Sequence, residues 1–147
     1  MGYIENNLMT GEKVLYRTYL HWFVFGWAIF WSILALFLFI VKFEIGGYIS
    51  LVFFFIAFIS ELITFKTSEF GLTDKRVLMK VGFIKRNSVE ILLKKVEGIQ
   101  IDQSIFGRIF DYGTIIISGT GGLKSPFHKI ASPLKFRKEI QEQISKI

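Results

Sequence analysis

The sequence predicts an α+β membrane protein, in which a two-helix transmembrane hairpin is followed by a small β-rich domain that ends in a capping helix. Three observations support this fold class. Two long apolar stretches lie close together in the first half of the 147-residue chain. A two-residue alternation of apolar and polar positions, which is typical of β-strands, begins directly after the second stretch. A helix-spaced apolar stripe then ends the chain.

The two apolar stretches are long enough to span a bilayer. Residues 21–41 contain no Lys, Arg, Asp or Glu, and residues 48–65 contain a single acid, Glu61. Each is about as long as the ~17–25 residues that a helix needs to cross hydrocarbon. Residues 42–47 include a Gly pair and predict a tight turn between antiparallel helices. Residues 1–20 are expected to be a short, amphipathic, cytoplasmic lead-in, so that the transmembrane hairpin occupies residues 21–65.

Basic residues are distributed unevenly along the chain. From Lys66 onward there are 15 Lys/Arg and 8 Asp/Glu, whereas the first 65 residues hold 3 and 4. Lys13 and Arg17 precede the first apolar stretch, and only Lys42 lies in the turn. Because cytoplasmic flanks are enriched in Lys and Arg, both termini are expected in the cytoplasm and the protein in the inner cell membrane as a multi-pass protein. The absence of cysteine fits a reducing compartment.

The segment after Lys66 predicts about six or seven strands. Alternating apolar positions that mark the first of them are Val77, Met79, Val81, Val89, Ile91, Leu93, Ile99 and Ile101. Residues 114–118 form a continuous apolar strand, and the glycines of residues 119–122 predict a hairpin turn because they accept positive φ. Residues 123–130 return as a strand at a sheet edge, since Pro126 has no N–H to donate to a neighbouring strand.

A helix is predicted to end the chain. Ser132 suits the N-cap and Pro133 suits the first helical position. The residues Phe136, Ile140, Ile144 and Ile147 form one apolar stripe, and the opposite side carries both signs of charge. We expect this stripe to cover the open mouth of a small barrel or curved sheet rather than to lie on the membrane surface.

In the order and spacing of its segments the chain resembles the bacterial pleckstrin-homology-like (PH-like) membrane proteins of the YdbS-like family. Three stretches carry the resemblance: GEKVLYRTYLHW, FGLTDKRVLMKVGFIKRNSVEILLKKVEGIQI and QSIFGRIFDYGTIIISGTGG. The resemblance implies a PH-like split β-barrel over residues 66–147, capped by the C-terminal helix and displayed on the cytoplasmic face. This segment is short for that fold, and a chain so small buries a modest fraction of its surface.

Seven cations are the candidate lipid- or partner-binding residues. They are Lys75, Arg76, Lys80, Lys85, Arg86, Lys94 and Lys95. Clustered at turns, such cations hold phosphate headgroups; alternatively they form a solvated face that balances nearby acids. Eukaryotic members of the wider PH fold hold phosphoinositides with a Lys-x-Arg element, and Lys85-Arg86 lacks that spacing. The resemblance therefore does not imply specific phosphoinositide binding.

Other motifs point away from catalysis. The stretch GTGGLKS departs from the P-loop, because Leu123 precedes Lys124 and no helix follows, and a hairpin turn is the better interpretation. Two histidines and no cysteine do not supply a metal site, and no cofactor is expected. A nucleophilic triad is not indicated by the spacing of Asp111, Ser125 and His128. Nucleic acid is not an expected partner, because the cations are not interleaved with aromatics in an RNA-binding motif.

Glu61 is the one acid inside an apolar stretch, and intramembrane carboxylates are functional candidates by default. Two interpretations stay open: it lies at the cytoplasmic interface, or it pairs the two helices at the level of residues 27–31, where Trp indoles can donate.

We expect a membrane-anchored, non-catalytic module that binds a protein partner or anionic phospholipid headgroups through its basic domain. The alternatives are a homo-oligomeric membrane scaffold and an accessory subunit of a membrane complex, in which the partner is a membrane protein.

Overall fold

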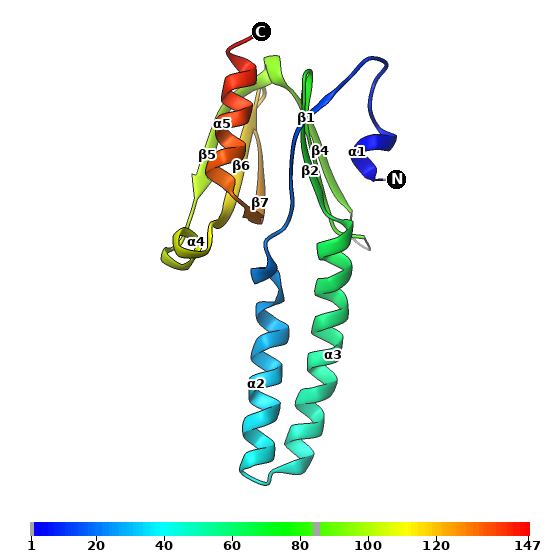
Figure 1. The fold of residues 1–147 in the computed structure, drawn as a ribbon, viewed down its shortest axis with the longest axis vertical. Helices are drawn as coiled ribbons and strands as arrows, with labels where there is room; N and C mark the ends of the chain where they lie inside the picture. Colours follow the sequence, from blue (N-terminus) through cyan, green and yellow to red (C-terminus); the bar gives the residue numbers. More distant parts are fainter. Residues whose placement is uncertain (1, 84–85) are drawn as a thin grey trace. The chain divides into compact units, whose positions relative to one another are not determined.

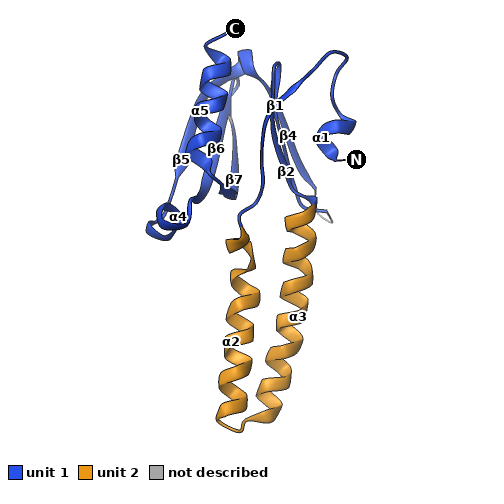
Figure 2. Cartoon of the chain, in the orientation of Figure 1, with its two compact units in different colours: residues 1–21, 67–147 blue, residues 22–66 orange. Residues whose placement is uncertain are grey.

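The chain folds into two units that are interleaved in sequence, as Figure 2 shows. The structure is a computed structural model that describes residues 2–83 and 86–147. Residues 22–66 form one unit, here called the helical unit. Residues 1–21 and 67–147 form the other, here called the sheet unit. The overall class is α+β, as the sequence predicts.

The helical unit consists of two apolar helices. A short 3₁₀ turn, η1 (Trp22–Phe25), leads into α2 (Gly26–Ile40), and α3 (Glu44–Thr67) follows after a short turn. By length and composition both segments are sufficient to cross a membrane. Aromatic rings fill the space between them, including Trp31 and Phe53, which stack with centroids 4.7 Å apart.

The turn between these helices differs from the expected one. The Gly46–Gly47 pair lies inside α3, and the turn is made by the residues before Glu44. A Cβ on Gly46 would stand 2.3 Å from the ring of Phe43, and a Cβ on Gly47 would stand 2.7 Å from the ring of Phe39. The glycines therefore make room for two aromatic rings against the start of α3 instead of breaking the helix.

Sheet A of the sheet unit has four antiparallel strands in the order β1-β2-β3-β4, of which β1, β2 and β4 are labelled in Figure 1. Their bounds are β1 (Val14–Thr18), β2 (Glu69–Thr73), β3 (Arg76–Val81) and β4 (Asn87–Leu92). Strand β1 precedes the helices in sequence and pairs with β2, which follows them. The expectation of a separate lead-in at residues 1–20 is therefore wrong, because this segment supplies both β1 and the short helix α1 (Tyr3–Asn6) to the sheet unit.

Sheet B has three antiparallel strands in the order β5-β6-β7. Strand β5 (Val96–Asp102) follows the 3₁₀ turn η2 (Leu93–Lys95), and α4 (Ile105–Phe110) links it to β6 (Tyr112–Gly119). The predicted glycine turn then leads to β7 (Leu123–Ala131), with Gly121 and Gly122 at φ of +98° and +78°. As predicted, β7 is the outermost strand of sheet B; an isolated bridge pairs its Ile130 with Leu20, which follows β1 in the chain.

The C-terminal helix α5 (Pro133–Ile144) covers the core between the sheets, as its apolar stripe predicts. Phe136 and Ile140 are fully buried, and Phe136 stacks on Tyr16 of β1 at 5.8 Å between ring centroids. Ser132 occupies the predicted N-cap position, but its side chain does not cap the helix: its backbone is left-handed at φ 47°, and its hydroxyl donates to Asp111 Oδ2 at 2.5 Å. Pro133 alone starts the helix, by its fixed φ.

Candidate functional site

Of the seven predicted cations, the six that the structure describes do not form one site. Arg76 and Lys80 are buried, and Lys85 lies outside the described residues. The remaining four, Lys75, Arg86, Lys94 and Lys95, are exposed. Arg76 and Lys80 are four positions apart on β3 and so share one face of the strand, and the N-terminal segment covers that face.

Arg76 is the centre of a buried ionic cluster. Its Nε and Nη2 atoms donate to the two carboxylate oxygens of Glu12, each at 3.0 Å. Its Nη1 donates to Glu90 Oε2 at 2.6 Å, and Nη2 also donates to the carbonyl oxygen of Asn7. Thr73 Oγ1 donates to Glu12 Oε1 at 2.7 Å. Such a two-pronged Arg–carboxylate pair fixes geometry as well as charge, so Arg76 fastens the N-terminal segment to sheet A.

The electrostatics of Glu12 reflect this pairing. Burial raises the pKa of the Glu12 carboxyl, but hydrogen bonds from Arg76, from the Met9 amide and from Thr73 outweigh burial and lower that pKa to about 2. Glu12 is therefore ionised at neutral pH, and its charge is matched by Arg76. This cation serves the fold and is not available to a lipid headgroup.

Lys80 is held by the same covering segment. Its Nζ lies 5.2 Å from the ring centroid of Tyr3, a cation–π arrangement. Glu69 accepts from the backbone amides of Tyr3 and Ile4, at 2.8 and 3.1 Å, and so holds the start of α1. The sequence analysis did not identify Glu12 and Glu69 as partners, because each lies more than 60 positions from the groups that it binds.

Lys75, Lys94 and Lys95 gather at one end of the sheet unit, here called the lysine end. The amide of Leu93 donates to the Lys75 carbonyl at 3.0 Å, which joins the β2–β3 turn to η2. The amide of Thr120 donates to the Lys95 carbonyl at 3.0 Å, which adds the β6–β7 turn. The predicted clustering of cations at turns thus holds for these three.

The chain passes to and from the helical unit at the opposite end, here called the connection end. The last residue of the sheet unit before the helices is His21, and the first after them is Thr67. Thr18 of β1 pairs with Phe70 of β2, so both crossings lie at the same end of sheet A. Strand β2 separates this end from the lysine end by about 16 Å, at ~3.3 Å per residue. Arg86, after the β3–β4 turn, lies at the connection end.

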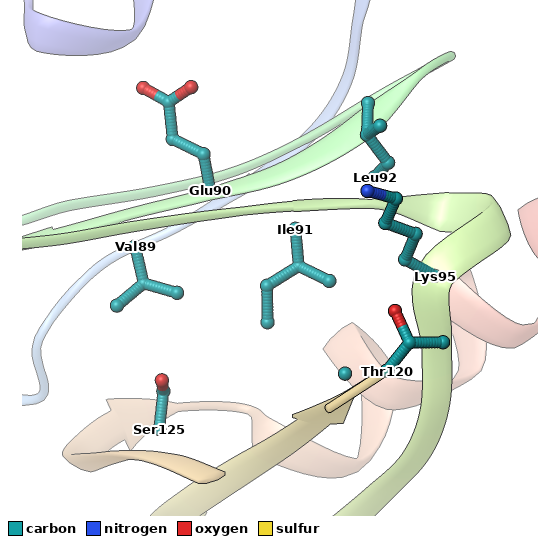
Figure 3. A pocket seen from close by; sticks show the side chains of 8 residues that line it. Val89, Glu90, Ile91, Leu92, Lys95, Thr120 and Ser125 are labelled. Carbon is teal, nitrogen blue, oxygen red and sulfur yellow. The ribbon is translucent and has the colours of Figure 1, made fainter. Parts of the chain in front are cut away.

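A groove lies beside the lysine end, between β4 and the β6–β7 turn. Its volume is about 300 Å³, and it is lined by Val89, Glu90, Ile91, Leu92, Lys95, Gly119, Thr120 and Ser125. Figure 3 shows Val89 and Ile91 pointing to the side on which Ser125 lies, whereas Glu90 and Leu92 point away. Strand β4 is the outermost strand of sheet A, so this groove runs along a sheet edge.

The candidate triad residues are not brought together. Ser125 lines the groove, whereas Asp111 accepts from the Ser132 hydroxyl. The Nδ1 atom of His128 lies 3.0 Å from Thr114 Oγ1 in a second depression of about 350 Å³. In the part of the chain that the structure describes, no three His, Cys, Asp or Glu residues are grouped as a metal site would require.

Glu61 joins the two helices of the helical unit. Its Oε2 accepts from the backbone amide of Ala28, in the first turn of α2, at 3.4 Å. The level on the first helix is the predicted one, but the donor is a backbone amide and not an indole. The free amides of a first helical turn favour a carboxylate, so the contact is consistent with helix pairing.

Comparison with known proteins adds one finding. A family model described as a bacterial PH domain matches residues 17–144, from β1 to the end of α5. No curated protein and no solved structure matches the chain. The match includes the helical unit within its span and confirms the resemblance that the sequence motifs indicate.

Proposed function

The chain belongs to the bacterial PH domain family, and from this premise we propose that it is a membrane-anchored, non-catalytic module that binds a protein partner. PH-like domains are generally non-catalytic binding modules, which supports the binding role. The two apolar helices support the membrane anchor. The excess of cations outside the apolar stretches supports cytoplasmic termini.

The groove beside β4 is the observation that carries the proposed partner site. An outermost strand offers backbone N–H and C=O groups to an added strand, and alternate side chains of that strand need pockets. Val89 and Ile91 supply an apolar floor, and Lys95 supplies a cation at the rim. We infer that the partner presents an extended, acidic segment that pairs with β4 and meets Lys94 and Lys95.

The place of the lysine end favours a protein over a lipid at this site. Both chain crossings lie at the connection end, whereas the lysine end is the opposite end of sheet A. Lys75, Lys94 and Lys95 lie about 16 Å along β2 from the connection end, so an anionic headgroup bound at that end would be farther from them than the Debye length of about 8 Å in physiological salt. Anionic headgroups are a second ligand class only for exposed cations at the connection end, such as Arg86 and Arg108.

The test is comparative purification of the full-length tagged protein from its native membrane. A Ser125→Trp variant fills the groove, and a Lys94→Glu/Lys95→Glu variant reverses its charge, whereas Lys146→Glu reverses an exposed charge at the C-terminus as a control. We expect both groove variants to lose about tenfold of the co-purified partner, equivalent to about 1.4 kcal/mol, and the control to retain it.

Equal recovery of partners by all variants would contradict the proposed site. Circular dichroism melts of each variant establish that the loss does not come from unfolding. If the chief co-purified protein is a second copy of this chain, the homo-oligomeric scaffold becomes the better account.

A further inference from the structure

Helix α4 turns its apolar face outward. In its sequence IFGRIF, the side chains of Ile105, Phe106 and Ile109 are 77%, 62% and 68% exposed, and Phe110 is 42% exposed. At 100° per residue these four positions lie on one side of the helix, with Gly107 on the other. A helix of a water-soluble domain ordinarily buries such a face, so the orientation of α4 is the reverse of the usual one.

Local contacts hold α4 in this orientation. The Ser104 hydroxyl accepts from the Gly107 amide at 3.1 Å and so caps the helix. Gly107 faces the start of β6, where an added Cβ would stand 2.6 Å from the carbonyl oxygen of Tyr112. The Gln103 side-chain amide donates to that same carbonyl at 3.1 Å. Because the inward position accepts only glycine, the large apolar residues are directed outward.

Helix α4 also lies at the connection end of the sheet unit. It leads into Tyr112, which pairs with Ala131, and the amide of Ala131 donates to the carbonyl of Tyr19 at 2.9 Å. Tyr19 stands two residues before His21, where the chain leaves for the helical unit. Figure 1 shows α4 at the end of β5 and β6 that is away from the C-terminus of α5.

A second exposed apolar side chain lies at the same end. Phe83 is 60% exposed and follows β3, whose residue Lys80 pairs with Glu69 at the start of β2. Two separate turns therefore carry large apolar groups to the end of the sheet unit where the chain crosses to the apolar helices.

We propose that α4 is a membrane-interface anchor, whose Ile105, Phe106, Ile109 and Phe110 side chains insert into the headgroup–acyl boundary of the bilayer. The inference rests on the proposed membrane anchoring by the helical unit. Only residues 19–21 separate β1 from η1, and only Ser68 separates α3 from β2, so short stretches of chain connect this end of the sheet unit to the apolar helices. Interfacial helices bury their apolar face about 5–10 Å into this boundary. Arg108 reaches headgroup phosphates from the flank of α4.

The absence of cysteine allows a direct test in the full-length protein. Single cysteines at 105, 106, 108, 109 and 110 are labelled with an environment-sensitive fluorophore after reconstitution in phosphatidylcholine–phosphatidylglycerol vesicles. Lipids with brominated acyl chains then act as quenchers. We expect about twofold stronger quenching at 106 and 109 than at 108, following the helical face. Leu15→Cys, an exposed apolar position on β1, is the control and should show little quenching.

A Val52→Cys label in α3 distinguishes failure of the proposed α4 anchor from failure of the proposed membrane anchoring by the helical unit. Strong quenching at 52 with no quenching at 106 and 109 overturns the α4 anchor and leaves membrane anchoring intact. Absence of quenching at 52 as well overturns the proposed anchoring itself. Labels at 106 and 109 that are shielded from both brominated lipid and aqueous iodide show that protein, and not lipid, covers α4, and also overturn the inference.

Discussion

The role of Arg76 differs between the sequence-based prediction, a ligand for lipid or a partner, and the structure, a buried partner of Glu12. As a cation on an alternating strand, Arg76 is indistinguishable from a headgroup ligand. In the fold it is 6% exposed and bonded to Glu12, Glu90 and the carbonyl of Asn7. The partner Glu12 stands 64 positions away in the chain, so no local pattern announces the pair.

Replacement of Glu12 by Gln should therefore be strongly destabilising. It leaves the Arg76 guanidinium buried without its main counter-charge, and breaking a buried pair in this way costs about 3–5 kcal/mol. Glu142→Gln is the matched control, since its contact with Lys138 is exposed and worth about 0–1 kcal/mol. Thermal unfolding in mild detergent, followed by circular dichroism, measures the difference. Equal melting temperatures for the two variants would show that the cluster is not a stabilising one.

The same cluster predicts a dependence of stability on acid. The pKa of Glu12 is lowered from 4.5 to about 2 in the folded state, so its contribution is complete above about pH 5 and is lost as the pH falls through about 2. The difference corresponds to about 3 kcal/mol at neutral pH. The melting temperature of the native protein should fall between pH 5 and pH 2 more steeply than that of Glu12→Gln. Parallel slopes would refute the assignment.

Glu61 makes a smaller, testable contribution in the helical unit. Its bond to the Ala28 amide joins α2 and α3, and interhelical hydrogen bonds in membranes are worth about 0.6 kcal/mol on average. Glu61→Leu should lower the stability of the hairpin to unfolding in sodium dodecyl sulfate by about this amount, with Ser60→Ala as the control. A stabilised Glu61→Leu variant would indicate that the carboxylate is retained for another purpose.

At the scale of elements, α5 could be predicted from the sequence because the pattern that specifies it lies within a few neighbouring residues. Phe136 and Ile140 lie one helical turn apart and their burial follows from that spacing. The β6–β7 turn was readable for a similar reason, since Gly121 and Gly122 have the positive φ that glycine tolerates best. The predicted turn at the Gly46–Gly47 pair was wrong, because the sequence does not distinguish a glycine at a close aromatic contact from a glycine in a turn.

Strand β1 could not be predicted from the sequence, because its pairing partner is distant in the chain. It has five residues, and its partner β2 lies beyond the whole helical unit. The amphipathic pattern before the first helix predicts a lead-in, whereas the pairing of Val14 with Thr73 and of Thr18 with Phe70 makes this segment strand β1. The groove beside β4 could not be predicted from local sequence either, since it joins β4 of sheet A to η2 and to the β6–β7 hairpin of sheet B.

The position of Phe136 provides a quantitative check of α5 as the covering helix. Phe136→Ala removes a fully buried ring that stacks on Tyr16, and such truncations cost about 3–5 kcal/mol. Leu134→Ala, two residues earlier and 50% exposed, should cost less than about 1 kcal/mol. Thermal melts of both variants decide the matter, and a Leu134→Ala effect equal to that of Phe136→Ala would argue against this packing.

At the scale of the whole molecule, the sheet unit is completed by residues on both sides of the helices. A fragment of residues 66–147 lacks β1, α1 and Glu12, and thus uncovers one face of sheet A and removes the main partner of Arg76. We expect this fragment to be unfolded, with poorly dispersed amide signals in nuclear magnetic resonance spectra. Residues 1–21 joined to 67–147 by a flexible linker should restore dispersion. A well-folded 66–147 fragment would show that β1 is dispensable.

The interleaved order also explains the expected shortness of the domain. The boundary at residue 66 omitted one strand of sheet A, and adding residues 1–21 gives two sheets of four and three strands covered by one helix. The helices thus form an insertion between β1 and β2, and the crossings at both ends of this insertion fix the connection end. The proposed roles of the two ends follow from that topology: partner binding at the lysine end and contact with lipid at α4.

The side of the membrane on which the sheet unit lies tests the central claim most directly. Lys75→Cys in the sheet unit and Lys42→Cys in the turn between the helices are each introduced into the cysteine-free chain. Intact cells are then treated with a membrane-impermeant maleimide. We predict labelling of cysteine 42 in intact cells and of cysteine 75 only after the membrane is permeabilised. Labelling of cysteine 75 in intact cells would contradict a membrane-anchored module that faces the cytoplasm.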